Sequence, residues 1–200
     1  MENGFIDFHE DLDITYRNLP HWHQDGKFQY LTCRLADSLP NKVLQIIKDL
    51  KEAFMACNPK PWDEKTLQRY HNVVSEKAEH YLSRGYGDCI LKNPEVRKIL
   101  EDAIFFYHGK KFEVNALVIM PNHLHIVLRM LCDNKIEDAL PGILRFSSVR
   151  INKLLQREGR VWMKDYFDRM VRSYEHYKHC ITYIKNNPKG LKKGEYTLIL

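Results

Sequence analysis

The stretch Val118-Ile-Met-Pro-Asn-His-Leu-His-Ile-Val-Leu128 decides the fold of this 200-residue chain. It joins an apolar run that ends at Pro121-Asn122 to a second run, 123–130, in which apolar and other residues alternate. Two runs of strand length around a tight turn are typical of a β-hairpin, and the apolar first run suits the middle of a sheet. We therefore predict a central β-hairpin.

His123 and His125 share one face of the second strand, because successive side chains of a strand point to opposite faces. Leu124 and Ile126 then form the core face, and the two imidazoles lie roughly 7 Å apart along the strand. Imidazoles arranged in this way can bind one divalent ion, and a central strand is rigid enough for a metal site. The pattern also fits an ordinary polar sheet face, which is how we interpret the second such triplet, His21-Trp22-His23.

Hydrophobic periodicity in the rest of the chain predicts an α+β fold, an antiparallel sheet covered by helices on one face. Besides the hairpin, the expected strands are 29–35 and 89–91, and residues 162–169 are either a strand or irregular. The expected helices are 41–54, 63–84, 93–104, 136–156 and 173–186, with Asn93 and Ser173 as N-caps. Residues 1–18 look like a loosely ordered lead-in and 42–82 like scaffold. The 200 residues together are expected to form one domain.

Composition sets broad limits on function. The excess of positive charge is only +5, which permits nucleic-acid binding but is common among proteins that bind none. Five cysteines are scattered without a Cys-x-x-Cys pair, which argues against a disulfide framework or a structural zinc site. The sequence has no apolar stretch of membrane-spanning length, and its first residues lack the features of a signal peptide. We therefore expect a cytoplasmic protein.

The hairpin stretch resembles the HUH motif (histidine, hydrophobic residue, histidine) of single-tyrosine transposases. Four further segments resemble the REP-associated branch of that superfamily, in the same order along the chain: Leu19-Pro20-His21-Trp22, Arg34-Leu-Ala-Asp-Ser-Leu-Pro40, Tyr166-Phe-Asp-Arg169 and Tyr183-Ile-Lys-Asn-Asn-Pro188. The resemblance covers about residues 19–191. It implies a ferredoxin-like or RRM-like HUH core and an enzyme that cleaves single-stranded DNA with Mg²⁺ or Mn²⁺.

The resemblance also implies that Tyr183 is the nucleophile, since the family's tyrosine follows the HUH strands in a helical segment that ends in Asn-Pro. The helix pattern is compatible with this role, because Tyr183 lies beside the apolar stripe formed by Tyr177, Cys180, Ile181 and Ile184. The pattern alone also fits a half-buried packing tyrosine. Two other tyrosines lie on this helix: Tyr177 fits the core better, and Tyr174 is at the helix start.

Asn187 lies one helical turn after Tyr183, where the family often supplies a third metal ligand beside His123 and His125. Its amide oxygen suits a hard cation. The residue also precedes Pro188, and an asparagine in that place has a plain role as helix terminator. Both interpretations stay open.

Basic residues interleaved with aromatic ones follow the hairpin, a mixture that holds the backbone and stacks the bases of single-stranded DNA. The predicted DNA-binding residues are Arg145, Arg150, Lys153, Arg157, Trp162, Lys164, Tyr166, Arg169 and Arg172. A solvated basic face over core aromatics would give the same pattern. Asp168 and Arg169 can also simply pair with each other.

The resemblance therefore implies a transposase that cuts and rejoins DNA through a 5′-phosphotyrosine at Tyr183, in the course of DNA transposition. Its expected partner is single-stranded or REP-like hairpin DNA of the bacterial nucleoid, bound by a monomer or a homodimer. Three alternatives stay open. They are a silent, domesticated hairpin-binding relative, an RNA-binding sheet module that would need aromatics on its central strands, and a metal-dependent hydrolase that would need acidic ligands.

Overall fold

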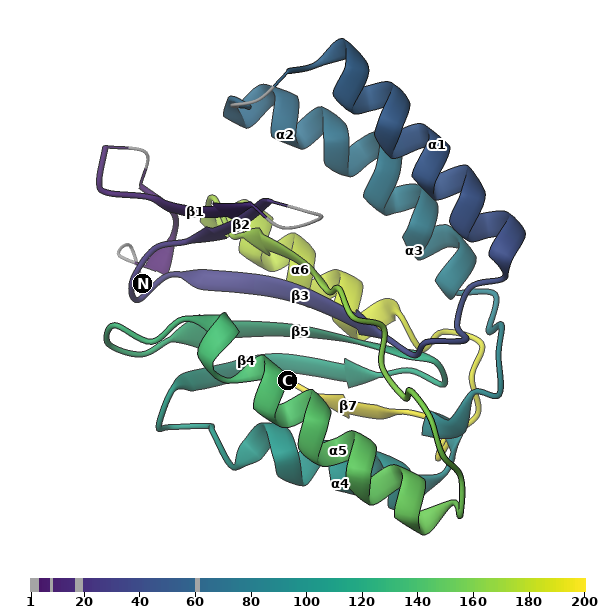
Figure 1. Cartoon of the computed structure of the whole chain (residues 1–200). Helices are drawn as coiled ribbons and strands as arrows, with labels where there is room; N and C mark the ends of the chain where they lie inside the picture. Colours follow the sequence, from purple (N-terminus) through teal and green to yellow (C-terminus); the bar gives the residue numbers. More distant parts are fainter. Residues whose placement is uncertain (1–3, 8, 17–19, 60–61) are drawn as a thin grey trace. The chain divides into compact units, whose positions relative to one another are not determined.

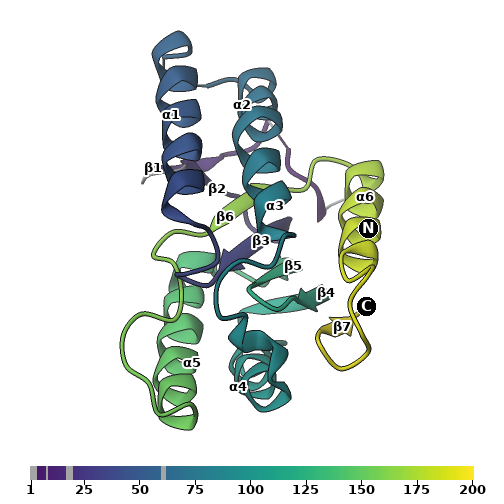
Figure 2. The same ribbon diagram turned by 90° about the vertical axis from the view of Figure 1, so that its right-hand side faces the viewer.

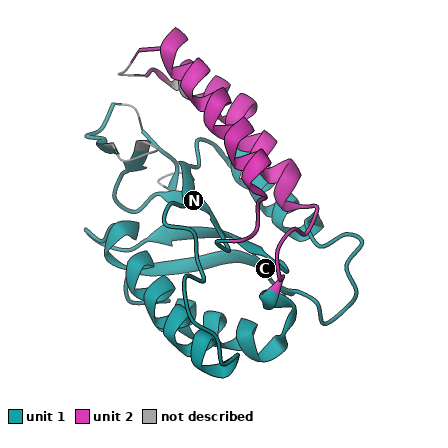
Figure 3. Cartoon of the chain, turned by 45° about the vertical axis from the view of Figure 1, so that its right-hand side comes forward, with its two compact units in different colours: residues 1–36, 90–200 teal, residues 37–89 magenta. Residues whose placement is uncertain are grey.

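The computed structural model describes residues 4–7, 9–16, 20–59 and 62–200. The chain forms two compact units, one made of residues 1–36 and 90–200 and the other of residues 37–89 (Figure 3). The histidine pair and Tyr183 belong to the first unit. That the whole chain acts as one functional domain stays a prediction.

A five-stranded antiparallel sheet forms the centre of the first unit, with the strand order β6-β3-β5-β4-β7 (Figure 1). The strands are β3 (Phe28–Arg34), β4 (Phe112–Ile119), β5 (His123–Met130), β6 (Phe167–Met170) and β7 (Thr197–Ile199). The predicted hairpin is confirmed, because β4 pairs with β5 and the Met120 N–H donates to the His123 carbonyl at 2.8 Å across the turn. β5 is the middle strand of the sheet.

Helices cover both faces of this sheet. On one face, α4 (Pro94–Phe105) and α5 (Leu140–Leu154) enclose an apolar core that includes Leu31, Leu117, Leu124, Ile126 and Leu128. On the other face lies α6 (Tyr174–Asn186) (Figure 2). Its buried Cys180 and Ile184 pack with Tyr30, Val118 and Val127. The predicted α+β class with an antiparallel sheet is confirmed. The helix cover extends to the second face because α6 has an apolar stripe of its own.

Two helices begin where the sequence predicted. Asn93 caps α4 by accepting a hydrogen bond from the Glu95 N–H at 2.9 Å, and Ser173 caps α6 by accepting one from the His176 N–H at 3.2 Å. The expected helix 136–156 is divided into a 3₁₀ turn, η4 (Ile136–Asp138), and α5, because Pro141 has no N–H to continue the first turn. No helix that the structure describes is both long and apolar enough to span a membrane.

The strand predicted at residues 89–91 is wrong. These residues lead into a 3₁₀ turn, η3 (Ile90–Lys92), in which Leu91 is buried in the core and its N–H donates to the Pro121 carbonyl. Cys89 has a φ of +51°. Periodicity cannot distinguish a strand from a buried turn over three apolar residues.

The N-terminal segment is more ordered than the sequence indicated. β1 (Asp13–Tyr16) and β2 (Pro20–His23) pair as a separate two-stranded antiparallel sheet, and the Ile6 N–H donates to the Val171 carbonyl. Residues 1–3, 8 and 17–18 of the predicted lead-in lie outside the described residues. A hairpin of this size is marginal without further contacts, so its order depends on tertiary packing that local patterns do not encode.

The second unit is helical, as its periodicity predicted. It consists of α1 (Asn41–Cys57), α2 (Glu64–Tyr70) and α3 (Glu76–Leu82), with a π-helical turn, η2 (His71–Ser75), between the last two. The rings of Phe54, Trp62 and Tyr70 pack together with centroids 5.0 to 5.4 Å apart. That this unit is scaffold stays a prediction.

All five cysteines are free, as their spacing indicated. Cys33 and Cys180 are buried, and burial raises the pKa of the Cys33 thiol to about 12, with a smaller contribution from the Asp168 carboxylate. Cys57 and Cys132 are exposed. Cys57 belongs to the second unit and Cys132 to the first.

Candidate active site

His123 and His125 lie on the face of β5 that α6 covers, as the alternation along the strand predicted. Their side chains are almost completely buried, with 2% and 1% of the residue surface exposed. The two ring centroids are 4.8 Å apart, and the ring planes are inclined by 78°. The sheet therefore holds two imidazoles side by side in its middle strand, under a helix.

Two hydroxyl groups of the neighbouring strand fix the His125 ring. Thr32 lies opposite His125 in the register between β3 and β5. The Tyr30 hydroxyl is 2.7 Å and the Thr32 hydroxyl 2.9 Å from Nδ1 of His125. Its Nε2, in contrast, is buried and has no hydrogen-bond partner among the described groups. Each hydroxyl can also accept, so when Nδ1 carries the hydrogen of the neutral ring and donates it to one of these oxygens, the lone pair of His125 is on Nε2 and can bind a metal.

The turn residue Asn122 fixes the second ring. Its side-chain oxygen lies 2.7 Å from Nδ1 of His123. An amide oxygen can only accept, so Nδ1 carries the hydrogen and the lone pair of His123 is on Nε2. Such outer partners are usual for histidines that bind metals, because they fix the tautomer and the orientation of the ring.

Burial keeps both imidazoles neutral. It lowers the pKa of His123 to about 3. The pKa of His125 is also well below its usual value, first through burial, then because a second protonated ring beside His123 would be repelled, and last through the positive charge of Arg169. Neutral imidazole is the form that binds a cation. The described residues include no cluster of three or more His, Cys, Asp or Glu side chains that could hold a metal, so the pair alone does not complete a shell.

Tyr183 is the tyrosine of α6 that contacts this pair. Its ring centroid is 5.2 Å from that of His125 and 6.3 Å from that of Tyr30, with the rings edge to face. The other two helix tyrosines are placed as the pattern indicated. Tyr177 packs against Phe28 with centroids 4.9 Å apart, and Tyr174 is 49% exposed at the helix start.

Asn187 is the C-cap of α6 and has helical backbone angles, φ −57° and ψ −42°, although it precedes Pro188. Its N–H donates to the Ile184 carbonyl at 3.3 Å. The helical geometry places Asn187 on the same side of α6 as Tyr183, one turn later. It therefore ends the helix, and its role as a metal ligand stays a prediction.

Four of the predicted DNA-binding residues line one groove of about 780 Å³ between α5 and residues 162–166: Arg145, Trp162, Lys164 and Tyr166. The two aromatic residues are core residues that reach the groove, because Trp162 is 4% and Tyr166 7% exposed. The Trp162 indole N–H donates to the Ser147 hydroxyl at 3.0 Å. Their burial limits the full-face base stacking that the sequence suggested.

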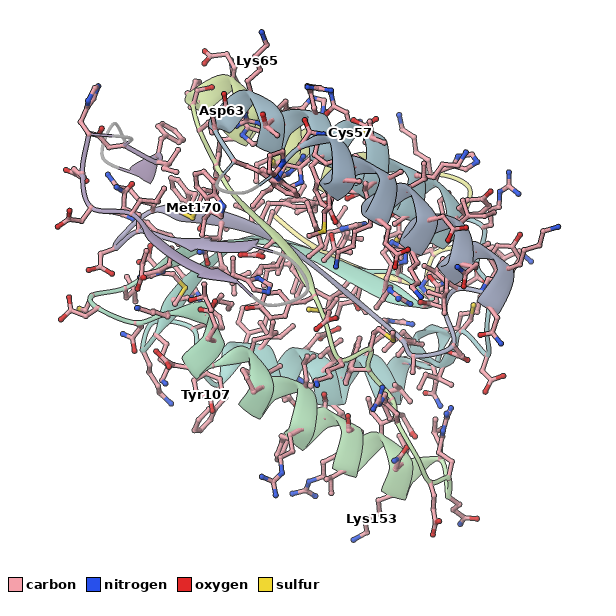
Figure 4. All side chains as sticks on the ribbon, turned by 45° about the horizontal axis from the view of Figure 1, so that its top comes forward. Cys57, Asp63, Lys65, Tyr107, Lys153 and Met170 are labelled. Atoms are coloured by element: carbon pink, nitrogen blue, oxygen red, sulfur yellow. The ribbon has the colours of Figure 1, made fainter. Side chains whose placement is uncertain are left out.

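The other predicted DNA-binding residues lie elsewhere. Arg150 and Lys153 are exposed on α5, where Arg150 lies over the Phe146 ring and Lys153 points outward from the helix (Figure 4). Arg157, in the loop after α5, and Arg172, just before α6, are half-buried. Arg169 lies on β6, near the histidines. The predicted set is thus divided between α5 with its groove and the α6 face of the sheet.

The polar interpretation of His21-Trp22-His23 is wrong in one respect, since the two histidines are buried rather than solvated. Nδ1 of His21 lies 2.5 Å from the Asp168 carboxylate, and the His21 ring packs on Tyr166 with centroids 4.7 Å apart. Nε2 of His23 lies 2.8 Å from Asp25. Asp168 therefore pairs with His21, and the pairing of Asp168 with Arg169 that the sequence left open does not occur.

Sequence reasoning missed Tyr30, Thr32 and Asn122, the residues that hold the histidine rings. Tyr30 and Thr32 are separated from His125 by more than 90 residues, and only the strand register brings them together. Asn122 carried a signal that could have been used, because a side-chain amide directly precedes the first histidine.

A family model described as transposase, IS200-like, matches residues 64–187. Two solved structures are similar at 15% sequence identity. The structure of a REP-associated tyrosine transposase bound to a REP hairpin aligns over 90% of this chain and 76% of that one, with a TM-score of 0.47. A candidate transposase of Deinococcus radiodurans R1 aligns over 80% of this chain and 89% of that one, with a TM-score of 0.33. No curated protein matches the chain.

Proposed function

The chain belongs to the IS200-like transposase family, and on this premise we propose that it cleaves and rejoins single-stranded DNA through Tyr183. The family gives it the general role of a transposase that acts on DNA. The covalent chemistry is our proposal. It rests on the position of the Tyr183 ring, 5.2 Å from the ring of His125, whose Nε2 has no partner among the described groups.

In the proposed reaction the Tyr183 oxygen attacks the phosphorus of one phosphodiester. A bond forms between this oxygen and phosphorus, and the bond to the 3′ oxygen of the preceding nucleotide breaks. The phenol loses its proton and the departing oxygen gains one, so the products are a 5′-phosphotyrosine and a 3′-hydroxyl. Attack by another 3′-hydroxyl reverses these changes and rejoins the strand, and no external energy source is needed because one phosphodiester replaces another.

The histidine pair and Asn187 are the residues we propose as metal ligands. A phenol of pKa about 10 is a weak nucleophile at neutral pH, and a bound Mg²⁺ or Mn²⁺ would polarise the phosphate and supply positive charge. His123 and His125 fit such an ion, since both are neutral and, with the hydrogen of each ring on Nδ1, the lone pair of each is on Nε2. Nitrogen ligands favour Mn²⁺, whereas cellular abundance favours Mg²⁺.

We propose that the DNA is single-stranded or a REP-like hairpin, bound by a monomer or a homodimer. The groove lined by Arg145 and Lys164 supports the binding of single-stranded DNA, because it combines two cations with the edges of two aromatic rings. The exposed Arg150 and Lys153 extend the positive charge along α5. The remaining proposed DNA contacts are made by Arg157, Trp162, Tyr166, Arg169 and Arg172.

The test is a search for a covalent protein–DNA adduct. The protein is incubated with labelled single-stranded DNA hairpins and Mn²⁺ or Mg²⁺ and then separated on a denaturing gel. We expect an adduct with the natural chain and none with Tyr183→Phe. Tyr177→Phe on the same helix is the matched control and should form the adduct. His123→Ala combined with His125→Ala should abolish cleavage and leave much of the hairpin binding.

Each other outcome contradicts part of the proposal. An adduct that survives Tyr183→Phe would overturn the assignment of the nucleophile. Cleavage without any adduct would indicate a metal-dependent hydrolase instead. Hairpin binding with neither cleavage nor adduct would indicate the alternative function, a silent DNA-binding protein.

A further inference from the structure

Arg169 lies on the same sheet face as the histidine pair. It pairs with Tyr30 in the register between β6 and β3, so both side chains point toward α6. Its guanidinium carbon is 4.7 Å from the centroid of the Tyr30 ring. The Tyr30 ring is also close to His125 and Tyr183, at 5.6 and 6.3 Å between centroids. One aromatic ring thus adjoins the histidine, the proposed nucleophile and a permanent positive charge.

No described carboxylate neutralises this charge. The neighbouring Asp168 points to the opposite face of β6 and is engaged by His21 at 2.5 Å. Within the part of the chain that the structure describes, Arg169 takes part in no ion pair, and its Nε is buried without a hydrogen-bond partner. A buried donor of a charged group that is left unmet lowers stability, so the arrangement requires an explanation.

Arg97 shows what a structural arginine looks like in the same unit. Its guanidinium donates to the carbonyls of Leu91, Lys92 and Gly194 and to the Thr197 hydroxyl, at distances of 2.6 to 3.1 Å. These contacts engage all three of its nitrogens and join α4 to the C-terminal strand. The fold can therefore satisfy a buried arginine where its role is structural, and Arg169 has no comparable set of acceptors.

We propose that Arg169 binds the non-bridging oxygens of the phosphate that Tyr183 attacks, an inference that rests on the function proposed above. A guanidinium offers two parallel N–H donors that match a phosphate in geometry and charge. When the tyrosine oxygen bonds to phosphorus and the bond to the 3′ oxygen breaks, negative charge is shared over the non-bridging oxygens. Donors fixed in advance at this position lower the barrier. Arg169 thereby differs from the arginines of α5, which would hold DNA away from the reacting atoms.

The test compares two substrates and three variants in single-turnover formation of the Tyr183 adduct. One DNA has an ordinary phosphate at the cleavage position, and the other has a methylphosphonate, which lacks one charged oxygen. On the phosphate, Arg169→Gln should slow adduct formation about 10²-fold, and Arg169→Lys should restore part of the rate because it keeps the charge. On the methylphosphonate, Arg169→Gln should cause a much smaller loss, since the oxygen it would bind is absent.

Arg129→Gln is the matched control. Arg129 lies on the same face of β5, stacks on the Phe28 ring at 5.9 Å and donates to the Gly26 carbonyl at 2.9 Å. It should keep the natural rate on both substrates. A melting curve would show whether Arg169→Gln is folded. If it is not, Arg169→Lys is compared with the natural chain instead. The Arg169→Lys variant should then form the adduct more slowly than the natural chain on the phosphate, and at the natural rate on the methylphosphonate.

Three outcomes would overturn the inference. Equal losses on the two substrates would mean that Arg169 acts only by supporting Tyr30. A natural rate in Arg169→Gln, with an adduct that still requires Tyr183, would overturn this inference and leave the proposed function intact. Absence of any adduct in the natural chain would overturn both.

Discussion

The two faces of the central sheet are built from the same strands but differ in chemistry. On the side of α4 and α5, alternate residues such as Leu31, Leu124 and Ile126 form a closed apolar core. On the side of α6, the residues between them include Tyr30 and the two histidines, which are equally buried. Buried polar groups lower stability unless they are paired. The difference teaches that one strand can stabilise the fold with every second residue and carry buried polar side chains with the others.

The largest effect is expected on the apolar face. Ile126→Ala leaves a cavity in a closed core, so the free energy of unfolding should fall by about 2–5 kcal/mol. The adduct rate per folded molecule should stay unchanged, because the face with His125 is untouched. Urea unfolding and single-turnover cleavage measure the two quantities, with Ile126→Val as a milder control. A large decrease in the adduct rate of the folded molecules would show that the apolar face also affects the reaction.

Acid should destabilise the α6 face. Unfolded histidine binds a proton below about pH 6.5, whereas native His123 does so only near pH 3. Unfolding therefore takes up protons in this range, and stability that is present above pH 6.5 is lost as the pH falls. At pH 5 His123 should lower the free energy of unfolding by about 2 kcal/mol. His125, whose pKa is also lowered, acts in the same direction.

Urea unfolding at pH 7 and pH 5, with a chelator present, checks this dependence. The variant with His123→Leu and His125→Leu should lose the larger part of it, and His176 on α6, whose pKa burial lowers to about 4, should retain the rest. An equally steep dependence in that variant would assign the acid sensitivity to other groups.

A smaller effect is expected where the chain supports the histidines. Tyr30→Phe removes one of the two hydroxyls at Nδ1 of His125 and keeps the ring under Arg169. Loss of such an outer partner should slow Mn²⁺-dependent adduct formation about 10–100-fold. Tyr177→Phe, on a tyrosine that packs against Phe28, should not slow it. Comparable losses in both variants would show that hydroxyl groups on this face matter only for packing.

The smallest effect concerns the start of α6. Ser173→Ala removes the acceptor of the His176 N–H and should lower the free energy of unfolding by about 1 kcal/mol. Ser148→Ala, in the middle of α5, removes only a bond to the Leu144 carbonyl and should have less effect. If urea unfolding shows equal decreases in the free energy of unfolding for the two variants, Ser173 does not stabilise the helix that carries Tyr183 by capping it.

Local patterns were sufficient where one segment carried all the information. Three features depend on residues that are close in sequence, and all three were predicted. They are the hairpin, the caps of α4 and α6, and the shared face of the two histidines. The stripe of α6 was also predicted from Cys180 and Ile184, which are fully buried. The prediction of a strand at residues 89–91 failed, because a run of three apolar residues is too short to show either helical or strand periodicity.

Contacts between distant segments were not accessible to this reasoning. The hydroxyls that hold His125 depend on strand register across more than 90 residues. The pairing of His21 with Asp168 depends on contact between β2 and β6, which belong to different sheets. The same limit affected the DNA-binding set, since Trp162 and Tyr166 were expected to stack bases and are instead largely buried. The sequence showed which side chains are charged, but it did not show which of these charged side chains lack an ion-pair partner in the fold.

The free thiols make the natural chain suitable for distance measurements by fluorescence. Cys57 in the second unit and Cys132 in the first are exposed, so a donor and an acceptor dye can be attached without adding a cysteine. Cys33 should resist labelling because it is buried and its pKa is raised to about 12, and Cys180 is buried as well. With the half-buried Cys89 replaced by serine, energy transfer between the two dyes would report directly on the separation of the units, with and without DNA.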